Sequence, residues 1–97
     1  MKYIVKYSSF FFNDTAAVET YLSQFSESAF PRFKSALDKS IEKIKAMPMM
    51  YAVYPFAPEY RHIVIDKYVL IYRFSEKGNT IYMYRLLHGA QNIPEYL

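Results

Sequence analysis

Two histidines, an arginine and two tyrosines supply the residue types that could do chemistry in this 97-residue chain. Histidine transfers protons near neutral pH, arginine holds a phosphate through paired hydrogen bonds, and tyrosine stacks on unpaired bases. Such residues are the parts of a metal-free site for RNA cleavage. The ordinary alternative is a set of cross-strand pairs on a half-exposed sheet, with tyrosine favoured by its strand propensity. The candidates are His62, Arg73, Tyr82, Tyr84 and His88.

Other classes of chemistry find little support in the composition. The chain has no cysteine and only two histidines, so we expect no metal site and no thiol nucleophile. Gly78 and Gly89 are the only glycines, too few for a phosphate-binding loop. No serine has the sequence context of a nucleophile elbow. We therefore expect no cofactor.

The composition predicts a small folded protein. The chain is 53% hydrophobic with a net charge of +3, which excludes disorder and gives no strong electrostatic attraction to nucleic acid. The length indicates one domain over residues 1–97. No apolar run reaches about 18 residues and no signal peptide is recognisable, so we expect a cytoplasmic protein with no membrane partner. The aromatic share, 20%, is high for so small a core.

The first half of the chain predicts a strand over 2–7 and two helices. Ser8 or Ser9 would cap the first helix, over 9–24, with Asn13 or Asp14 as alternative caps. An amphipathic stripe follows Ser28 and predicts the second helix, which Pro48 ends. Ion pairs are expected on its exposed side. The stripe is Phe30, Phe33, Leu37, Ile41, Ile44 and Met47, and the ion pairs are Lys34–Asp38 and Glu42–Lys45.

The second half predicts strands. Residues 49–56 are apolar but contain proline, which favours an edge strand or a covering loop. Strands are expected over 60–65, 68–74 and 80–87, joined by the pair Asp66-Lys67 and by a four-residue turn at 76–79. The order β-α-α-β-β-β indicates an α+β fold, with a helix hairpin packed on one face of a small antiparallel sheet.

These turn lengths predict a register for the strands. Arg61 pairs with Tyr72 across the first turn, and the second turn pairs Arg73 with Tyr82, Ile71 with Tyr84 and Val69 with Leu86. Alternation then places two sets of residues on opposite faces. We expect Arg61 and Arg85 to pack their stems on apolar surface, with their heads in water or paired to Glu59 or Glu95. The helix-side set is Arg61, Ile63, Ile65, Tyr68, Leu70, Tyr72, Phe74, Ile81, Met83, Arg85 and Leu87; the open-face set is His62, Val64, Val69, Ile71, Arg73, Tyr82, Tyr84, Leu86 and His88.

The layout resembles the toxins of the RelE/ParE superfamily of bacterial type II toxin–antitoxin modules, over essentially the whole chain. Residues 28–48 end in the helix-then-proline junction typical of the family. Tyr60 to Tyr72 is similar to its Tyr-Arg, short turn, Tyr-x-x-x-Tyr hairpin. Residues 81–89, followed by Ala90-Gln91-Asn92, are similar to its closing strand and His/Tyr-Gly-x-Arg-Asn/Asp ending.

The resemblance implies a RelE/ParE-like growth inhibitor of the plasmid-stabilisation type, neutralised by a cognate antitoxin in a hetero-oligomer. The antitoxin is expected across the helix hairpin and sheet, as a helix in a groove or an added strand. Members of this superfamily divide into two functional classes. ParE-like members act on DNA gyrase by binding, whereas RelE-like members cut mRNA on the ribosome by activating the ribose 2′-hydroxyl without a metal.

Residue by residue, the resemblance favours the binding class. Ribonuclease members place an arginine after the tyrosine that starts the third strand, where this chain has Val69, and another where it has Gln91. A ribonuclease would have to use His62, Arg73 and His88 instead, and an inactive homologue is a further alternative. The residues expected to contact substrate or target are Tyr60, Arg61, Tyr82, Tyr84, Arg85, Gln91 and Tyr96.

Overall fold

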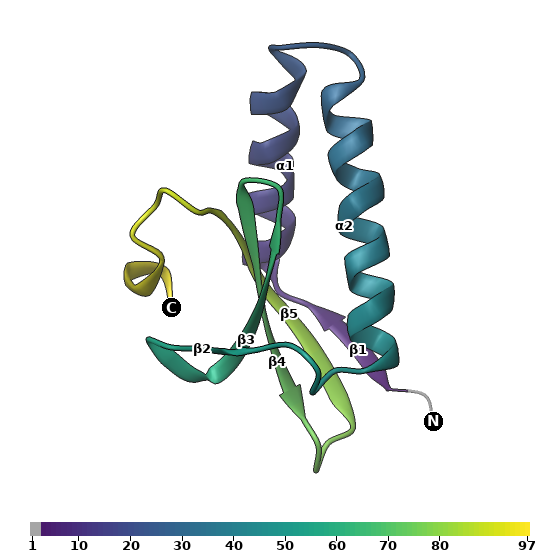
Figure 1. Ribbon diagram of the computed structural model, residues 1–97, viewed down its shortest axis with the longest axis vertical. Helices are drawn as coiled ribbons and strands as arrows, with labels where there is room; N and C mark the ends of the chain where they lie inside the picture. Colours follow the sequence, from purple (N-terminus) through teal and green to yellow (C-terminus); the bar gives the residue numbers. More distant parts are fainter. Residues whose placement is uncertain (1–2) are drawn as a thin grey trace.

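The computed structural model describes residues 3–97 and begins with a short strand and a helix hairpin (Figure 1). Strand β1 spans Ile4–Tyr7, helix α1 Ser9–Ser23 and helix α2 Ala29–Ala46. Lys2, where the predicted strand begins, lies outside the described residues. Ser8 caps α1, because its hydroxyl accepts a 2.9 Å hydrogen bond from the Phe11 amide. The alternative caps, Asn13 and Asp14, are wrong.

Helix α2 follows the predicted stripe. Phe33, Leu37, Ile41 and Ile44 are buried at its inner face, as the spacing requires. Both predicted ion pairs form on the exposed side: Lys34 to Asp38 at 2.6 Å and Lys45 to Glu42 at 3.1 Å. Met47 follows the last turn as the C-cap and remains exposed, so the stripe is buried only as far as Ile44.

The remaining strands build a five-stranded sheet in the order β1-β5-β4-β3-β2. Strand β2 spans Val53–Tyr54, β3 Ala57–Ile65, β4 Tyr68–Ser75 and β5 Thr80–His88, and a 3₁₀ helix, η1, spans Ile93–Tyr96. The α+β fold with its helix hairpin is confirmed. The sheet is mixed rather than purely antiparallel, because β1 pairs in parallel with the edge of β5 that the β3–β4–β5 meander leaves open.

The two predicted turns both form. Asp66 and Asn79 have φ angles of 55° and 51°, a left-handed conformation that aspartate and asparagine tolerate better than most residues. The first turn sets the predicted register between β3 and β4, with Arg61 opposite Tyr72. The second turn pairs Arg73 with Tyr82, also as predicted.

Beyond that pair, the predicted register of β4 and β5 is wrong by one residue. Tyr72 pairs with Met83 but Ile71 pairs with Arg85, so Tyr84 is an extra residue, a β-bulge. Helix α1 and its N-cap residue hold the bulged backbone. The Ser8 hydroxyl donates to the Tyr84 carbonyl, and an Asp14 carboxylate oxygen accepts from the Leu86 amide at 3.0 Å. The expected pairs Ile71–Tyr84 and Val69–Leu86 are therefore replaced, and Val69 faces Leu87.

The bulge also exchanges residues between the two faces of the sheet. Leu86 is buried on the helix side and Leu87 on the opposite side, the reverse of the predicted assignment. His88 pairs with Tyr68 and packs against it on the helix side, so its predicted place on the open face is wrong too. The opposite face has its own apolar cluster, formed by Tyr54, Ala57, Val69, Ile71, Leu87 and Ile93.

Candidate functional site

The three candidate acid–base and phosphate-binding residues do not come together. His62 lies opposite Ile71 and therefore two positions along β4 from Arg73, on the same open face. His88 lies opposite Tyr68, five positions from Arg73, which is about 17 Å at the rise of an extended strand. Because His88 also lies on the helix side, these residues form no single constellation.

His62 makes two contacts with one carbonyl group. Its backbone amide and its ring Nδ1 lie 3.0 and 3.1 Å from the oxygen of Ala52. A carbonyl oxygen only accepts hydrogen bonds, so this contact requires the proton on Nδ1 and leaves Nε2 as the acceptor of the neutral ring. The ring also packs edge-on against Tyr54, 5.3 Å between centroids. His62 thus anchors the segment that precedes β2.

Three tyrosines form a ladder across the open face. The rings of Tyr60 and Tyr84 stack at 5.0 Å between centroids, those of Tyr82 and Tyr84 lie 6.2 Å apart, and the Arg73 guanidinium lies 5.9 Å from the Tyr82 ring. Burial, and then the neighbouring Tyr84, raise the pKa of the Tyr60 hydroxyl. At neutral pH this phenol is therefore a hydrogen-bond donor or acceptor and not an anionic base.

The rest of the open face is closed by the C-terminal 3₁₀ helix. Ile93 is 5% exposed and packs with Val69, Ile71 and Leu87. Val69 itself is 8% exposed. The position after Tyr68, where the resemblance places an arginine in ribonucleases, is therefore occupied by a core residue of a closed apolar cluster.

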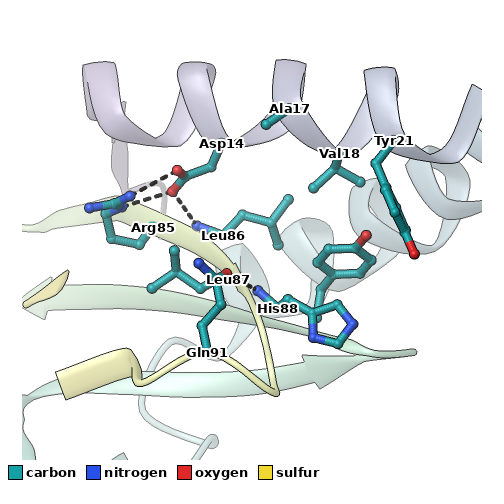
Figure 2. Close-up of a pocket in the computed structure, with 10 residues that line it drawn as sticks. Asp14, Ala17, Val18, Tyr21, Arg85, Leu86, Leu87, His88 and Gln91 are labelled. Atoms are coloured by element: carbon teal, nitrogen blue, oxygen red, sulfur yellow. Dashed lines mark hydrogen bonds and ion pairs between the residues drawn. The ribbon is translucent and has the colours of Figure 1, made fainter. Parts of the chain in front are cut away.

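Arg85 is bound by an aspartate that the sequence analysis did not assign to it (Figure 2). Its Nε and Nη2 donate to the two carboxylate oxygens of Asp14 at 2.8 and 2.9 Å, and each side chain is only 13% exposed. The hydrogen bonds to Asp14 raise the pKa of the guanidinium. The rings of Phe10 and Tyr96 lie 4.9 and 5.4 Å from it. The expected pairing with Glu95 or Glu59 is wrong. The Nε/Nη2 side of the guanidinium is occupied by Asp14, and its Nη1 lies 3.5 Å from the carbonyl oxygen of Tyr96.

Arg61, the other arginine of the predicted helix side, also has its head bound within the protein. Its Nη1 donates to the carbonyl of Tyr51 at 2.6 Å and lies 3.3 Å from that of Met49. These partners are backbone groups rather than the predicted acidic residue. Arg61 therefore stabilises the chain between α2 and β2.

A small pocket lies between α1 and the end of β5 (Figure 2). Its volume is about 190 Å³, below the range of ordinary ligand pockets. The Ala90 amide donates to His88 Nδ1 at 3.0 Å, and the Gln91 side-chain oxygen accepts from the His88 amide at 2.8 Å. His88 and Gln91 thus fix the turn after β5. The pocket is lined by Asp14, Ala17, Val18, Tyr21, Tyr68, Arg85, Leu86, Leu87, His88 and Gln91.

A second hollow, of about 240 Å³, lies between the two helices next to β1. Phe12, 60% exposed, stands at its rim, and the ring of Tyr7 lies 5.8 Å from it. The α2 side of the hollow carries the Lys34–Asp38 pair. The hollow is therefore apolar along α1 and charged along α2. We call it the helix groove; its lining is Tyr7, Phe11, Phe12, Thr15, Lys34, Leu37, Asp38 and Ile41.

The described side chains include no group of three histidines and acidic residues placed to hold a metal ion. None of the helices in this part of the chain is long and apolar enough to cross a membrane.

Comparison with known proteins identifies the family. The sequence-family model described as the ParE toxin of the type II toxin–antitoxin system parDE matches residues 5–93. No curated protein matches the sequence. Solved structures share the fold as well, and the three described next do so at low sequence identity.

The chromosomal ParDE system of P. aeruginosa aligns with a TM-score of 0.73 at 13% identity, over 90% of this chain and 96% of that one. The RelBE2 toxin–antitoxin complex of Mycobacterium tuberculosis aligns with a TM-score of 0.56 at 17% identity, over 91% of this chain and 99% of that one. A double mutant of the E. coli toxin RelE in the free state aligns with a TM-score of 0.61 at 11% identity, over 99% of this chain and 93% of that one. With nearly its whole length matched by the family model, the chain belongs to the ParE toxins of type II toxin–antitoxin systems, within the RelE/ParE superfamily.

Proposed function

We propose that this toxin inhibits growth by binding a protein target and does not cut RNA. The observation that carries the proposal is the burial of Val69 beneath Ile93 of η1. An arginine at this position could reach a phosphate only if η1 were displaced from the sheet. A site that must hold a phosphodiester needs such cationic donors, and the part of the face around Val69 offers apolar side chains instead.

The other candidate residues support the same proposal. His62 and His88 lie on opposite faces, so they cannot act as an acid and a base on one phosphate. Arg85 is engaged by Asp14, which leaves Arg73 as the one arginine of the candidate set with an exposed head. The target that the resemblance to ParE-like members implies is DNA gyrase, and we propose gyrase here.

We further propose that a cognate antitoxin neutralises the toxin at the helix groove and the neighbouring edge of β1. The groove presents exposed Phe12 and Tyr7, which a partner helix would cover. The amides of Ile4 and Ser8 donate toward β5, so by alternation those of Val5 and Tyr7 face the open edge, where a strand can be added. The hetero-oligomer would form in the cytoplasm, and a role in plasmid stabilisation follows if the two genes lie on a plasmid.

The test uses purified toxin, freed of antitoxin, in gyrase assays. We expect it to inhibit supercoiling or to accumulate cleavage complexes, and added antitoxin to reverse the effect. Unchanged supercoiling and cleavage by a toxin that arrests growth would contradict gyrase as the target. New 5′ ends in transcripts mapped by primer extension after induction would support the ribonuclease instead. If induction causes no growth arrest, the chain is an inactive homologue.

A further inference from the structure

Residues 47–56, here called the methionine segment, expose an unusual amount of apolar surface. The segment joins α2 to β3 at the end of α2 farthest from its connection to α1 (Figure 1). Of the four methionines in residues 3–97, three lie in this segment, and the other, Met83, is fully buried in the core. Five large apolar side chains of the segment are between 41% and 74% exposed: Met47, Met49, Met50, Val53 and Phe56.

The backbone of this segment is fixed by side chains of the sheet. The Tyr72 hydroxyl donates to the Pro48 carbonyl at 2.7 Å. Arg61 donates to the carbonyl of Tyr51 at 2.6 Å, and His62 holds that of Ala52 through its amide and its ring. Within the segment, the Met50 amide donates to the Met47 carbonyl at 3.1 Å and closes a turn. Its exposed side chains therefore stand on an ordered backbone.

Inward-facing residues alternate with the exposed ones. Pro48 and Tyr54 are buried, and Tyr51 is half-buried against the helix-side core. With these anchors in place, the outward methionines cannot turn into the core. A preordered segment loses little entropy when a partner covers it, and unbranched methionine side chains adapt to the shape of the partner. Next to Met49, a hollow of about 480 Å³, also bordered by Tyr3, Phe74, Glu76 and Asn79, can receive a partner side chain.

The charge beside the segment is strongly one-sided. Helix α2 carries five basic and two acidic residues, a net +3 that equals the net charge of the whole chain. Lys34 and Lys45 are paired, whereas Arg32, Lys39 and Lys43 make no ion pair within residues 3–97. These three are seven and four residues apart, so they form one exposed line, here called the basic stripe. Lys43 lies one turn before Met47, where the stripe reaches the methionine segment.

We propose that the methionine segment and the basic stripe together are the surface that docks the toxin's protein target, and that the target presents an apolar patch with an acidic rim. The inference rests on the proposed function, because it assumes that the toxin acts by binding a protein. This surface shares no residue with the helix groove proposed for the antitoxin. Substitutions can therefore separate the two interactions.

The test compares two variants with the wild type. The triple variant M47Q/M49Q/M50Q makes the segment polar at exposed positions, so the fold should survive. Phe12→Gln makes the same kind of change in the helix groove. Affinities for purified DNA gyrase and for the cognate antitoxin are measured by biolayer interferometry, and growth arrest is measured after induction. We expect the triple variant to bind gyrase about tenfold or more weakly and to bind antitoxin about as tightly as the wild type. Phe12→Gln should show the opposite pattern.

The outcomes separate this inference from the proposed function. If wild-type toxin arrests growth but does not bind gyrase, gyrase is the wrong target, and growth arrest still decides the inference. A triple variant that arrests growth as strongly as the wild type while binding antitoxin would overturn the docking surface, whatever the target is. Equal gyrase affinity of triple variant and wild type would overturn it as well. Val64→Gln, an exposed apolar position on β3, is the control and should change neither affinity.

Discussion

Arg85, a residue type that often binds phosphate, has a structural role in this protein. Its guanidinium binds both oxygens of Asp14 and lies 4.9 and 5.4 Å from the ring centroids of Phe10 and Tyr96. The same carboxylate accepts a hydrogen bond from the Leu86 amide. Two side chains 71 positions apart thus connect the first helix to the bulge of the last strand, and one substitution should disturb both.

Asp14→Asn should therefore be strongly destabilising. It leaves a mostly buried guanidinium without its counter-charge, and we expect a loss of about 2 kcal/mol in the free energy of unfolding. Urea denaturation of the purified toxin measures this. Asp38→Asn, which removes the exposed partner of Lys34, is the matched control and should cost about 0.5 kcal/mol or less. Equal losses in the two variants would show that the Asp14 pair contributes no more than a surface ion pair.

Tyr72 is a second buried polar residue whose partner can be tested. Burial raises the pKa of its hydroxyl from 10.0 to about 12, so the native state keeps a proton that the unfolded chain releases above pH 10. Stability should thus fall between pH 10 and pH 12, and by less in Tyr72→Phe than in the wild type. At neutral pH the variant leaves the Pro48 carbonyl unpaired, which should cost about 1–2 kcal/mol. Denaturant midpoints measured at several pH values, with Tyr51→Phe as control, test both parts.

At the scale of elements, the bulge in β5 and the 3₁₀ helix η1 decide which surface the sheet offers. The bulge turns Leu87 toward the open face, where it completes the cluster under Ile93. Without η1, the apolar cluster around Val69 would be open to solvent. The element that closes it is only four residues long, and Ile93 is its buried residue.

Ile93→Ala should release η1 while the rest of the fold persists. The truncation removes buried apolar contacts worth about 2 kcal/mol, which is large for a four-residue terminal element. Hydrogen exchange at the amides of Glu95 and Leu97, which bond within η1, should then accelerate severalfold while the amides of β4 stay protected. Unchanged exchange at these two amides would mean that other contacts hold η1 in place. RNA cleavage should not appear in this variant, because Val69 is not a phosphate ligand.

At the scale of the whole molecule, charge and apolar surface are unevenly distributed. The net positive charge of α2 equals that of the whole chain. The helix groove lies along α2, and the methionine segment follows the C-terminal end of this helix. Opposite charge on a partner accelerates association, and this effect weakens as salt screens it. The basic stripe should therefore affect the rate of target binding more than the lifetime of the complex.

The double variant K39E/K43E tests this prediction. At low salt we expect its association rate with gyrase to fall about tenfold, and at high salt the two rates should converge. The control K34E/K45E has the same change of net charge on another side of α2, and its rate should fall by less. Stopped-flow fluorescence at several salt concentrations measures the rates. An equal fall in both double variants would indicate attraction by net charge alone and no role for the stripe.

The local features of this fold could be read from the sequence because neighbouring residues determine them. The stripe of α2, the Ser8 cap and the two turns depend on contacts within a few positions, and each is present as predicted. Alternation correctly placed His62 and Arg73 on the same face, since no irregularity lies between them in β3 and β4. The family resemblance rested on this order of elements.

Only the tertiary structure decided the composition of the site. The extra residue at Tyr84 has no signature in the sequence of β5, because the bulge is held by Ser8 and Asp14 of another element. One inserted position reverses the face of every strand residue that follows it. His88 therefore lies on the opposite face from Arg73, and Leu87 packs under Ile93. The sequence by itself thus determined the elements and the family, whereas long-range hydrogen bonds decided which side chains share a face.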